Sequence, residues 1–166
     1  MNATRTFGQR LLLLIGSVGP LGHAPASGTV TVAVAGIPLF LLIRWLTLPL
    51  TWYLVFLALL TAAAVWVHHV GDRLLGEKDS RKLVLDELVG FFVAMTAVPA
   101  TWQFILAGFL IERGIDIIKV PPANLVEKKV PGGWGVVGDD VIAGLYTLVL
   151  LHLGGYLLPG WLGLAG

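Results

Sequence analysis

The chain has 166 residues, of which 57% are hydrophobic and only 13% are charged, whereas soluble domains carry about 25% charged residues. This composition indicates one integral membrane domain over residues 1–166. A net charge of +1 argues against nucleic acid as the main partner, because no dense basic surface could release phosphate counterions. The absence of cysteine excludes disulfides, thiolate metal sites and cysteine nucleophiles.

A short apolar segment follows the basic N-terminus. Residues 11–15 are fewer than the roughly 7 to 15 residues of a signal-peptide core, so a cleaved leader is not expected. We predict an interfacial helix that lies on the membrane surface. Arg5 and Arg10 would then face lipid headgroups.

Two uncharged segments on either side of Arg44 come next. Residues 28–43 and 45–67 predict the first two membrane spans, because about 20 apolar residues cross a bilayer as a helix. A charged connection, "GDRLLGEKDSRK", follows the second span. Its two glycines are expected to break the helix.

The second half of the chain predicts three more spans. The segments "LVLDELVGFFVAMTAVP" and "WQFILAGFLIERGIDIIKV" indicate a helical hairpin, and residues 141–158 predict the last span. Prolines and glycines in "PPANLVEKKVPGGWGVVG" separate the hairpin from that span. We therefore expect an all-α, polytopic helical bundle with about five spans and an N-terminal interfacial helix. A homo-oligomer is compatible with this architecture.

The distribution of basic residues predicts the orientation. If Arg44 lies outside, all other lysines and arginines fall on the opposite side of the membrane. They are Arg5, Arg10, Arg73, Lys78, Arg81, Lys82, Arg113, Lys119, Lys128 and Lys129. Basic residues accumulate in cytoplasmic connections, so the N-terminus is predicted to be cytoplasmic.

With this topology, acidic side chains of three spans reach one depth near the cytoplasmic boundary. They are Asp86 and Glu87 in the third span, Glu112 and Asp116 near the end of the fourth, and Asp139 and Asp140 at the opening of the fifth. Such oxygen ligands suit hard divalent cations such as Mg²⁺. We predict a metal site here, with Glu112 as a structural partner.

The cations beside these acids point to an anionic substrate. Arg113 and Lys119 flank Asp116 at a spacing of three residues, which places all three on one helical face. Hydrolysis of a phosphate ester needs a metal to activate water and cationic groups to balance the developing charge. The Gly-rich segments "SGT" and "GGWGVVG" could bring backbone N–H groups close to a phosphate.

Structural interpretations compete with these roles. The acidic pairs of the third and fifth spans could be ordinary acids at helix N-termini, and Asp116 could merely pair with Arg113 or Lys119. We interpret His68 and His69 as interfacial residues without a role at the site. The acids Asp72, Glu77 and Asp79 are assigned to a solvated connection of mixed charge.

Three motifs carry a resemblance to a known family. In their order and spacing, "LVLDELVGFFVAMTAVP", "AGFLIERGIDIIKVPP" and "GGWGVVGDDVIAG" resemble phosphatidylglycerophosphatase A, and the similarity extends over residues 16–151. The resemblance implies a small bacterial membrane enzyme that hydrolyses phosphatidylglycerophosphate, a lipid, to phosphatidylglycerol and phosphate. It also implies Mg²⁺ dependence and an active site that faces the cytoplasm from the inner membrane.

The same resemblance assigns the site residues. It places the family's acids at Asp86, Glu87, Asp116, Asp139 and Asp140, which we predict to be catalytic and to bind the metal, one of them as general base. It places the phosphate-binding residues at Arg113 and Lys119, with Gly28 and Thr29 as the Gly-Thr core of the family's first loop.

Two other functions remain open from the residues alone. A small divalent-cation transporter or channel would use the same acids along a permeation path, which requires carboxylates at several depths. A non-catalytic membrane scaffold would give the acids no reason to converge.

Overall fold

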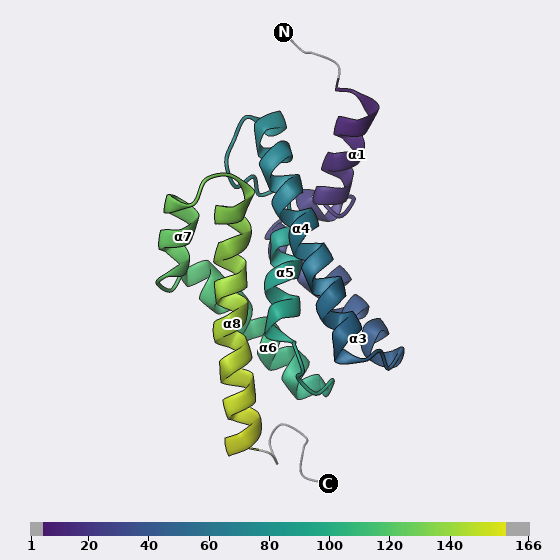
Figure 1. The fold of residues 1–166 in the computed structure, drawn as a ribbon, viewed down its shortest axis with the longest axis vertical. Coiled ribbons are helices and arrows are strands. Elements are labelled where there is room, and N and C mark those ends of the chain that lie inside the picture. The colour runs from purple at the N-terminus through teal and green to yellow at the C-terminus, as the bar shows by residue number, and fades with distance from the viewer. Residues whose placement is uncertain (1–4, 159–166) are drawn as a thin grey trace.

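The computed structural model describes residues 5–158, and this part of the chain folds into helices and their connections only (Figure 1). The predicted all-α class is thereby confirmed. The elements are α1 (Phe7–Gly16), the 3₁₀ turn η1 (Leu21–His23), α2 (Ser27–Thr31), the π-helical η2 (Val32–Gly36), α3 (Ile37–Trp45), α4 (Leu50–Leu75), α5 (Leu85–Ala94), α6 (Trp102–Ile118), α7 (Ala123–Lys129) and α8 (Gly133–Leu157).

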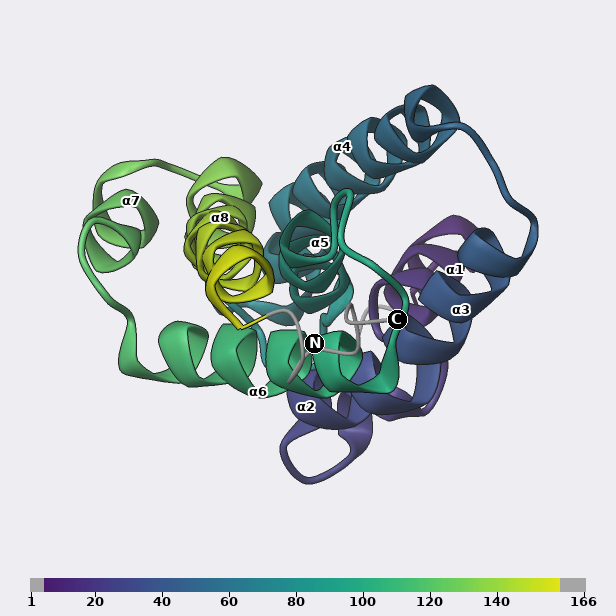
Figure 2. The ribbon, with the colours of Figure 1, turned by 90° about the horizontal axis from the view of Figure 1, so that it is seen from below.

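The short helix α5 lies at the centre of the bundle. Helices α4, α6 and α8 and the α2–η2 segment pack around it (Figure 2). Apart from Glu87, every residue of α5 is buried, as expected for a helix that is apolar on nearly all sides. The rings of Phe91 and Phe92 contact Phe40 of α3, and the Tyr53 hydroxyl of α4 donates a 2.6 Å hydrogen bond to the Phe92 carbonyl.

Within the described part of the chain, three continuous helical segments are long and apolar enough to cross a membrane: Ser27–Trp45, Leu50–Leu75 and Gly133–Leu157. The prediction of about five spans is not confirmed, because α5 has 10 residues and α6 has 17. Ten helical residues extend only about 15 Å, half of a hydrocarbon core of about 30 Å. After α5 the chain turns at Ala97, whose φ is 55°.

The chain nevertheless alternates direction as predicted. The α3–α4 and α5–α6 connections both lie in the lower half of Figure 1, above the C-terminal end of α8. The α4–α5 connection and the start of α8 lie toward the other end. Arg44, near the end of α3, is therefore separated along the long axis from the basic α4–α5 connection.

Helix α8 begins at Gly133, well before the predicted start near residue 141. A Cβ atom on Gly133 would meet the Val65 carbonyl group of α4, with its carbon 2.9 Å away, and one on Gly135 would meet the Val130 carbonyl oxygen. The glycines thus permit close packing against α4 and the end of α7, which outweighs a helix cost of about 1 kcal/mol per glycine. Asp139 and Asp140 lie well inside this helix, so the prediction that they open it is wrong.

Helix α4 also differs from its predicted bounds. It starts at Leu50, after the cap residue Pro49, and it continues to Leu75, where Gly76 ends it with a φ of 76°. The helix therefore includes residues 68–73, which the sequence assigned to the membrane interface and the solvated connection. Asp72 is buried, so its predicted solvated position is wrong, and His68 is fully enclosed by the bundle.

Two helical glycines offer a matched test of the packing. A Cβ on Gly144 of α8 would lie 2.8 Å from Cβ of Val93 in α5, whereas one on Gly114 of α6 would have no neighbour within 4 Å. We expect Gly144→Ala to destabilise the protein by about 1 to 3 kcal/mol through overpacking. Gly114→Ala should be neutral or stabilising by up to about 1 kcal/mol. Unfolding of the purified variants in detergent measures both, and equal effects would contradict the packing described.

Candidate active site

A cavity of about 610 Å³ opens where α2, the α4–α5 connection, α5, α6 and α8 meet. We call it the acidic cavity, since carboxylates outnumber the lysines and arginines in its lining. Every site residue predicted from the sequence lines it: Gly28, Thr29, Asp86, Glu87, Arg113, Asp116, Lys119, Asp139 and Asp140. Residues from four separate parts of the chain are thus brought into one place.

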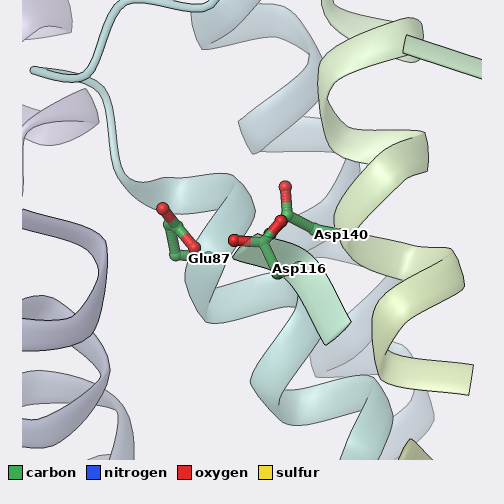
Figure 3. Close-up of side chains that lie close together, drawn as sticks. All are labelled: Glu87, Asp116 and Asp140. Atoms are coloured by element: carbon green, nitrogen blue, oxygen red, sulfur yellow. The ribbon is translucent and has the colours of Figure 1, made fainter. Parts of the chain in front are cut away.

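Three of the carboxylates converge closely. Glu87 of α5, Asp116 of α6 and Asp140 of α8 each offer an oxygen atom, and these atoms all lie within 4.8 Å of one another (Figure 3). Carboxylates this close favour protonation unless a cation balances them. The three acids could hold a metal ion.

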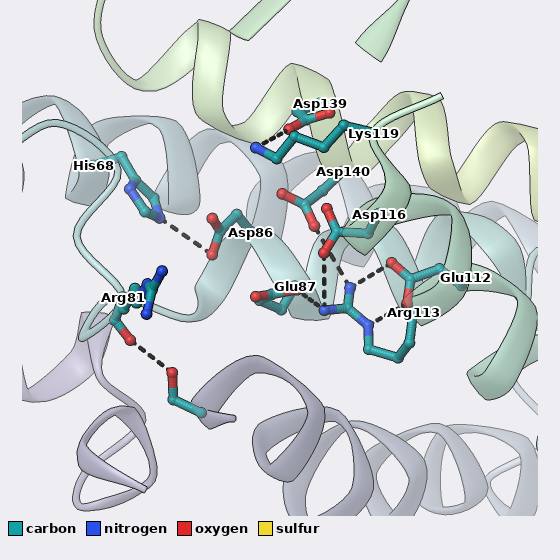
Figure 4. A network of polar contacts seen from close by, with 11 residues as sticks. His68, Arg81, Asp86, Glu87, Glu112, Arg113, Asp116, Lys119, Asp139 and Asp140 are labelled. Atoms are coloured by element: carbon teal, nitrogen blue, oxygen red, sulfur yellow. Dashed lines mark hydrogen bonds and ion pairs between the residues drawn. The ribbon is translucent and has the colours of Figure 1, made fainter. Parts of the chain in front are cut away.

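Arg113 is the cation that balances these acids in the structure (Figure 4). Its Nε and Nη2 atoms donate to the two oxygens of Glu112 at 2.7 and 2.6 Å. Its Nη1 atom donates to Glu87 and, at 3.4 Å, to Asp116, while Nη2 lies 3.6 Å from Asp140. Glu112 has no exposed surface, so its bidentate pairing with Arg113 fits the predicted structural role.

Lys119 forms ion pairs with two further acids of the cavity, Asp139 and Glu127. It caps the end of α6 with a φ of 54°, which turns the chain toward α7. Its Nζ atom donates 2.8 Å hydrogen bonds to Asp139 and to Glu127 of α7. Glu127 also lines the acidic cavity. The sequence analysis did not predict Glu127 as a site residue, because nothing in the sequence of residues 123–129 indicates that α7 folds back onto α8.

Asp86 faces a buried histidine that the sequence analysis did not assign to the site. Nε2 of His68 lies 3.2 Å from Oδ1 of Asp86, and Nδ1 lies 3.7 Å from Oδ1 of Asp72. Asp72 in turn accepts the backbone N–H groups of Asp79 and Ser80 at 3.1 and 3.2 Å. A sequence signal that could have identified this pair was the position of His68 four residues before Asp72 in a largely apolar segment. This spacing puts both side chains on one face of a helix.

The electrostatics of the cavity affect a residue of the α4–α5 connection as well. Burial raises the pKa of Asp79, and the nearby negative charge of Asp86 raises it further. Asp79 is half-buried and lines the acidic cavity, so its predicted place in a fully solvated connection is wrong. Glu77 is exposed, as predicted.

Buried carboxylate oxygens around the acidic cavity could bind a metal ion. Oδ1 of Asp139 forms no hydrogen bond or ion pair within residues 5–158. Oδ1 of Asp86 and Oδ1 of Asp140 also form no hydrogen bond, although Nε2 of His68 lies 3.2 Å from the first and Nη2 of Arg113 lies 3.6 Å from the second. Buried polar atoms nearly always have a partner, so several such carboxylate oxygens around one cavity are unusual. Hard divalent cations take oxygen ligands of this kind.

The glycines near the cavity have different tasks. A Cβ atom on Gly28 would collide with the Glu87 carboxylate, so glycine leaves the room that this acid occupies. Gly133 and Gly135 instead pack against α4 and the end of α7, and neither lines the acidic cavity. The segment "GGWGVVG" is helical from Gly133 on, and only its Val136 lines the acidic cavity, so the hypothesis of a phosphate-binding loop there is not supported.

The placement of acids bears on the transporter alternative. The long apolar stretches at residues 28–67, 88–111 and 141–158 contain no Asp or Glu. The acids in the described chain therefore gather at one end of the bundle, whereas a permeation path needs ligands at several depths. This distribution favours a reaction site over a path through the membrane.

Comparisons with known proteins agree with the motifs. The family model described as phosphatidylglycerophosphatase A matches residues 14–154. The phosphatidylglycerophosphatase A of Haemophilus influenzae is 33% identical over 125 residues, which cover 75% of this chain and 69% of the relative. That of Escherichia coli is 30% identical over 128 residues, which cover 76% and 73%.

A third relative has a different printed activity. The putative phosphatidylinositol-3-phosphatase of Bacteroides thetaiotaomicron is 31% identical over 148 residues, which cover 85% of this chain and 91% of the relative. No solved structure matches the chain. The family match covers the three motifs whose acids meet in the acidic cavity, and the chain belongs to the phosphatidylglycerophosphatase A family.

Proposed function

We propose that this protein is a Mg²⁺-dependent lipid phosphatase that hydrolyses the terminal phosphomonoester of phosphatidylglycerophosphate to phosphatidylglycerol and phosphate. The observation that carries the proposal is the convergence of Glu87, Asp116 and Asp140 around Arg113 in one cavity. Membership of a family named for this reaction supports it.

In this proposal three of the five acids bind the metal ion, and the other two act as further ligands or as the general base. Glu87, Asp116 and Asp140 hold Mg²⁺, because their oxygens already lie within 4.8 Å of one another. Oδ1 of Asp139 has no hydrogen-bond partner, and Oδ1 of Asp86 faces His68, so either carboxylate can complete the ligand set or accept a proton from water. When bound, the ion supplies positive charge at the phosphoryl oxygens and makes water a stronger nucleophile.

The cationic residues bind the phosphoryl group in this proposal. Glu112 accepts hydrogen bonds from Nε and Nη2 of Arg113, so the guanidinium presents a fixed edge to the cavity. Lys119 lies beside Asp139 and can neutralise the negative charge of the phosphoryl group as the P–O bond to the leaving glycerol oxygen breaks. Thr29 and the Gly28 backbone line the cavity and can add hydrogen bonds.

We further propose that the protein lies in the bacterial inner membrane with the acidic cavity facing the cytoplasm. The concentration of lysine and arginine away from Arg44 supports this orientation. A five-pass topology is compatible with the short α5, because neighbouring helices bury it and its ends do not have to reach both surfaces of the bilayer.

Substitution of one convergent acid tests the assignment. Asp140→Asn removes a ligand charge, and phosphate release from phosphatidylglycerophosphate in mixed micelles should fall at least about 100-fold, since even outer-shell changes at metal sites cost 10 to 100-fold. Glu77→Gln, which alters an exposed acid outside the acidic cavity, should retain wild-type activity. An active Asp140→Asn protein with unchanged unfolding would contradict the role.

Removal of divalent cations tests the metal. Purified protein treated with EDTA should release no phosphate from the lipid, and added Mg²⁺ should restore release, because the carboxylates cannot activate water without the cation. Activity that persists after exhaustive chelation would refute metal dependence. The transporter alternative expects no phosphate release under either condition.

His68 and His69 form a matched pair of variants. His68 is buried beside Asp86, whereas His69 is exposed and its Nε2 atom lies 3.0 Å from Nη2 of Arg73. We expect His68→Gln to raise the Mg²⁺ concentration for half-maximal activity by about 10 to 100-fold, because it releases a metal-binding carboxylate. His69→Gln should leave it unchanged. Binding of Mn²⁺, followed by electron paramagnetic resonance, should show the same difference, and equal behaviour of the two variants would contradict it.

A further inference from the structure

A second cavity of about 320 Å³ adjoins the acidic cavity. It lies between α1, the end of α4 and the α4–α5 connection, and we call it the basic cavity. The two cavities share the lining residues His23, Lys82 and Leu83, so they adjoin each other at the α4–α5 connection. The remaining lining includes Arg5 and Arg10.

The charge of the basic cavity is opposite to that of its neighbour. No Asp or Glu lines it, whereas carboxylates dominate the acidic cavity. Arg5, Arg10 and Lys82 take part in none of the ion pairs found within residues 5–158. Arg113 and Lys119, by contrast, are bonded to carboxylates. The basic cavity thus offers cations that are available to an anion.

The backbone around Lys82 is held in place from two sides. The Val84 N–H group donates a 2.8 Å hydrogen bond to the Gly16 carbonyl at the end of α1. The Ser27 hydroxyl donates a 2.7 Å hydrogen bond to the Arg81 carbonyl, and a Cβ on Gly22 would lie only 3.0 Å from the Lys82 carbonyl carbon. The backbone of Lys82 is therefore fixed at the junction of the cavities before any ligand binds, so only its side chain has to be ordered on binding.

Apolar residues complete the basic cavity. Leu13 and Leu14 of α1 and Leu75 of α4 line it beside the cations. Neighbouring Phe7 and Leu11 on α1 are 82% and 44% exposed, so the helix presents apolar surface that suits contact with lipid. Cations next to apolar side chains match the phosphate and glycerol backbone of an anionic phospholipid.

We propose that the basic cavity binds the phosphodiester group of the lipid substrate, an inference that rests on the proposed function. Phosphatidylglycerophosphate carries two anionic groups joined by one glycerol, a terminal phosphomonoester and a phosphodiester to the diacylglycerol. Arg10 and Lys82 hold the phosphodiester, and the glycerol passes His23 and Leu83. The phosphomonoester then reaches the acidic cavity, so this arrangement selects a lipid with two phosphates over a soluble phosphate ester.

The test uses phosphatidylglycerol, which keeps the phosphodiester and lacks the phosphomonoester. Its binding to the full-length protein in detergent micelles with EDTA involves no turnover. Arg10→Gln/Lys82→Gln should weaken binding about tenfold, because it removes charge-assisted hydrogen bonds, and should raise KM for phosphatidylglycerophosphate by a similar factor with kcat unchanged. Both residues are exposed, so the variant should fold normally.

The matched control is Lys128→Gln/Lys129→Gln, which removes the same charge from exposed positions on α7, across the molecule from α1 (Figures 1 and 2). It should bind phosphatidylglycerol as wild type does. Equal weakening of phosphatidylglycerol binding in both double variants would overturn the inference. Full displacement of phosphatidylglycerol by inorganic phosphate at an equal concentration would overturn it as well. So would an unchanged KM in Arg10→Gln/Lys82→Gln while wild type hydrolyses the lipid. A wild-type protein that binds phosphatidylglycerol at Arg10 and Lys82 but releases no phosphate would overturn the proposed function alone.

Discussion

The buried ion pair of Arg113 with Glu112 is the interaction on which the rest of the site depends. Charges taken out of water are costly unless they are paired with good geometry, and two hydrogen bonds of 2.6 and 2.7 Å meet that condition. The guanidinium so fixed presents its remaining donors to acids from two other helices. Without this cation, α5, α6 and α8 could not pack with their carboxylates turned inward.

Small residues give the acids the room that this arrangement needs. A Cβ on Gly90 of α5 would lie 2.6 Å from Oε1 of Glu112 and 3.0 Å from the Asp140 carbonyl oxygen. Gly28 performs the same task for the Glu87 carboxylate. The apolar rings on the far half of α5 anchor the helix, and its glycine and acidic residues shape the cavity at its start. The short helix α5 thus connects the hydrophobic core to the acidic cavity.

Charge is segregated along the path that a lipid headgroup would follow. The acidic cavity gathers oxygen ligands for a cation, and the adjoining basic cavity gathers cations for an anion. A substrate with two phosphates on one glycerol complements both, provided that a metal offsets repulsion between its terminal phosphate and the carboxylates. The α4–α5 connection separates the two environments, and its anchorage on α1 and α2 explains how a surface segment can hold a fixed position.

The sequence by itself determined the apolar, helical character of the chain and the residues of the candidate site, because hydropathy and the three motifs are local properties of the chain. Asp86, Glu87, Asp116, Asp139 and Asp140 were all predicted, and all line one cavity. Only the tertiary structure decided which acids converge, since it pairs Asp86 with His68 of α4 and Asp139 with Lys119 at the end of α6, while Glu87, Asp116 and Asp140 come together around Arg113. It also decided that a glycine-rich segment is helical, because contact with α4 and α7 outweighs local helix propensity.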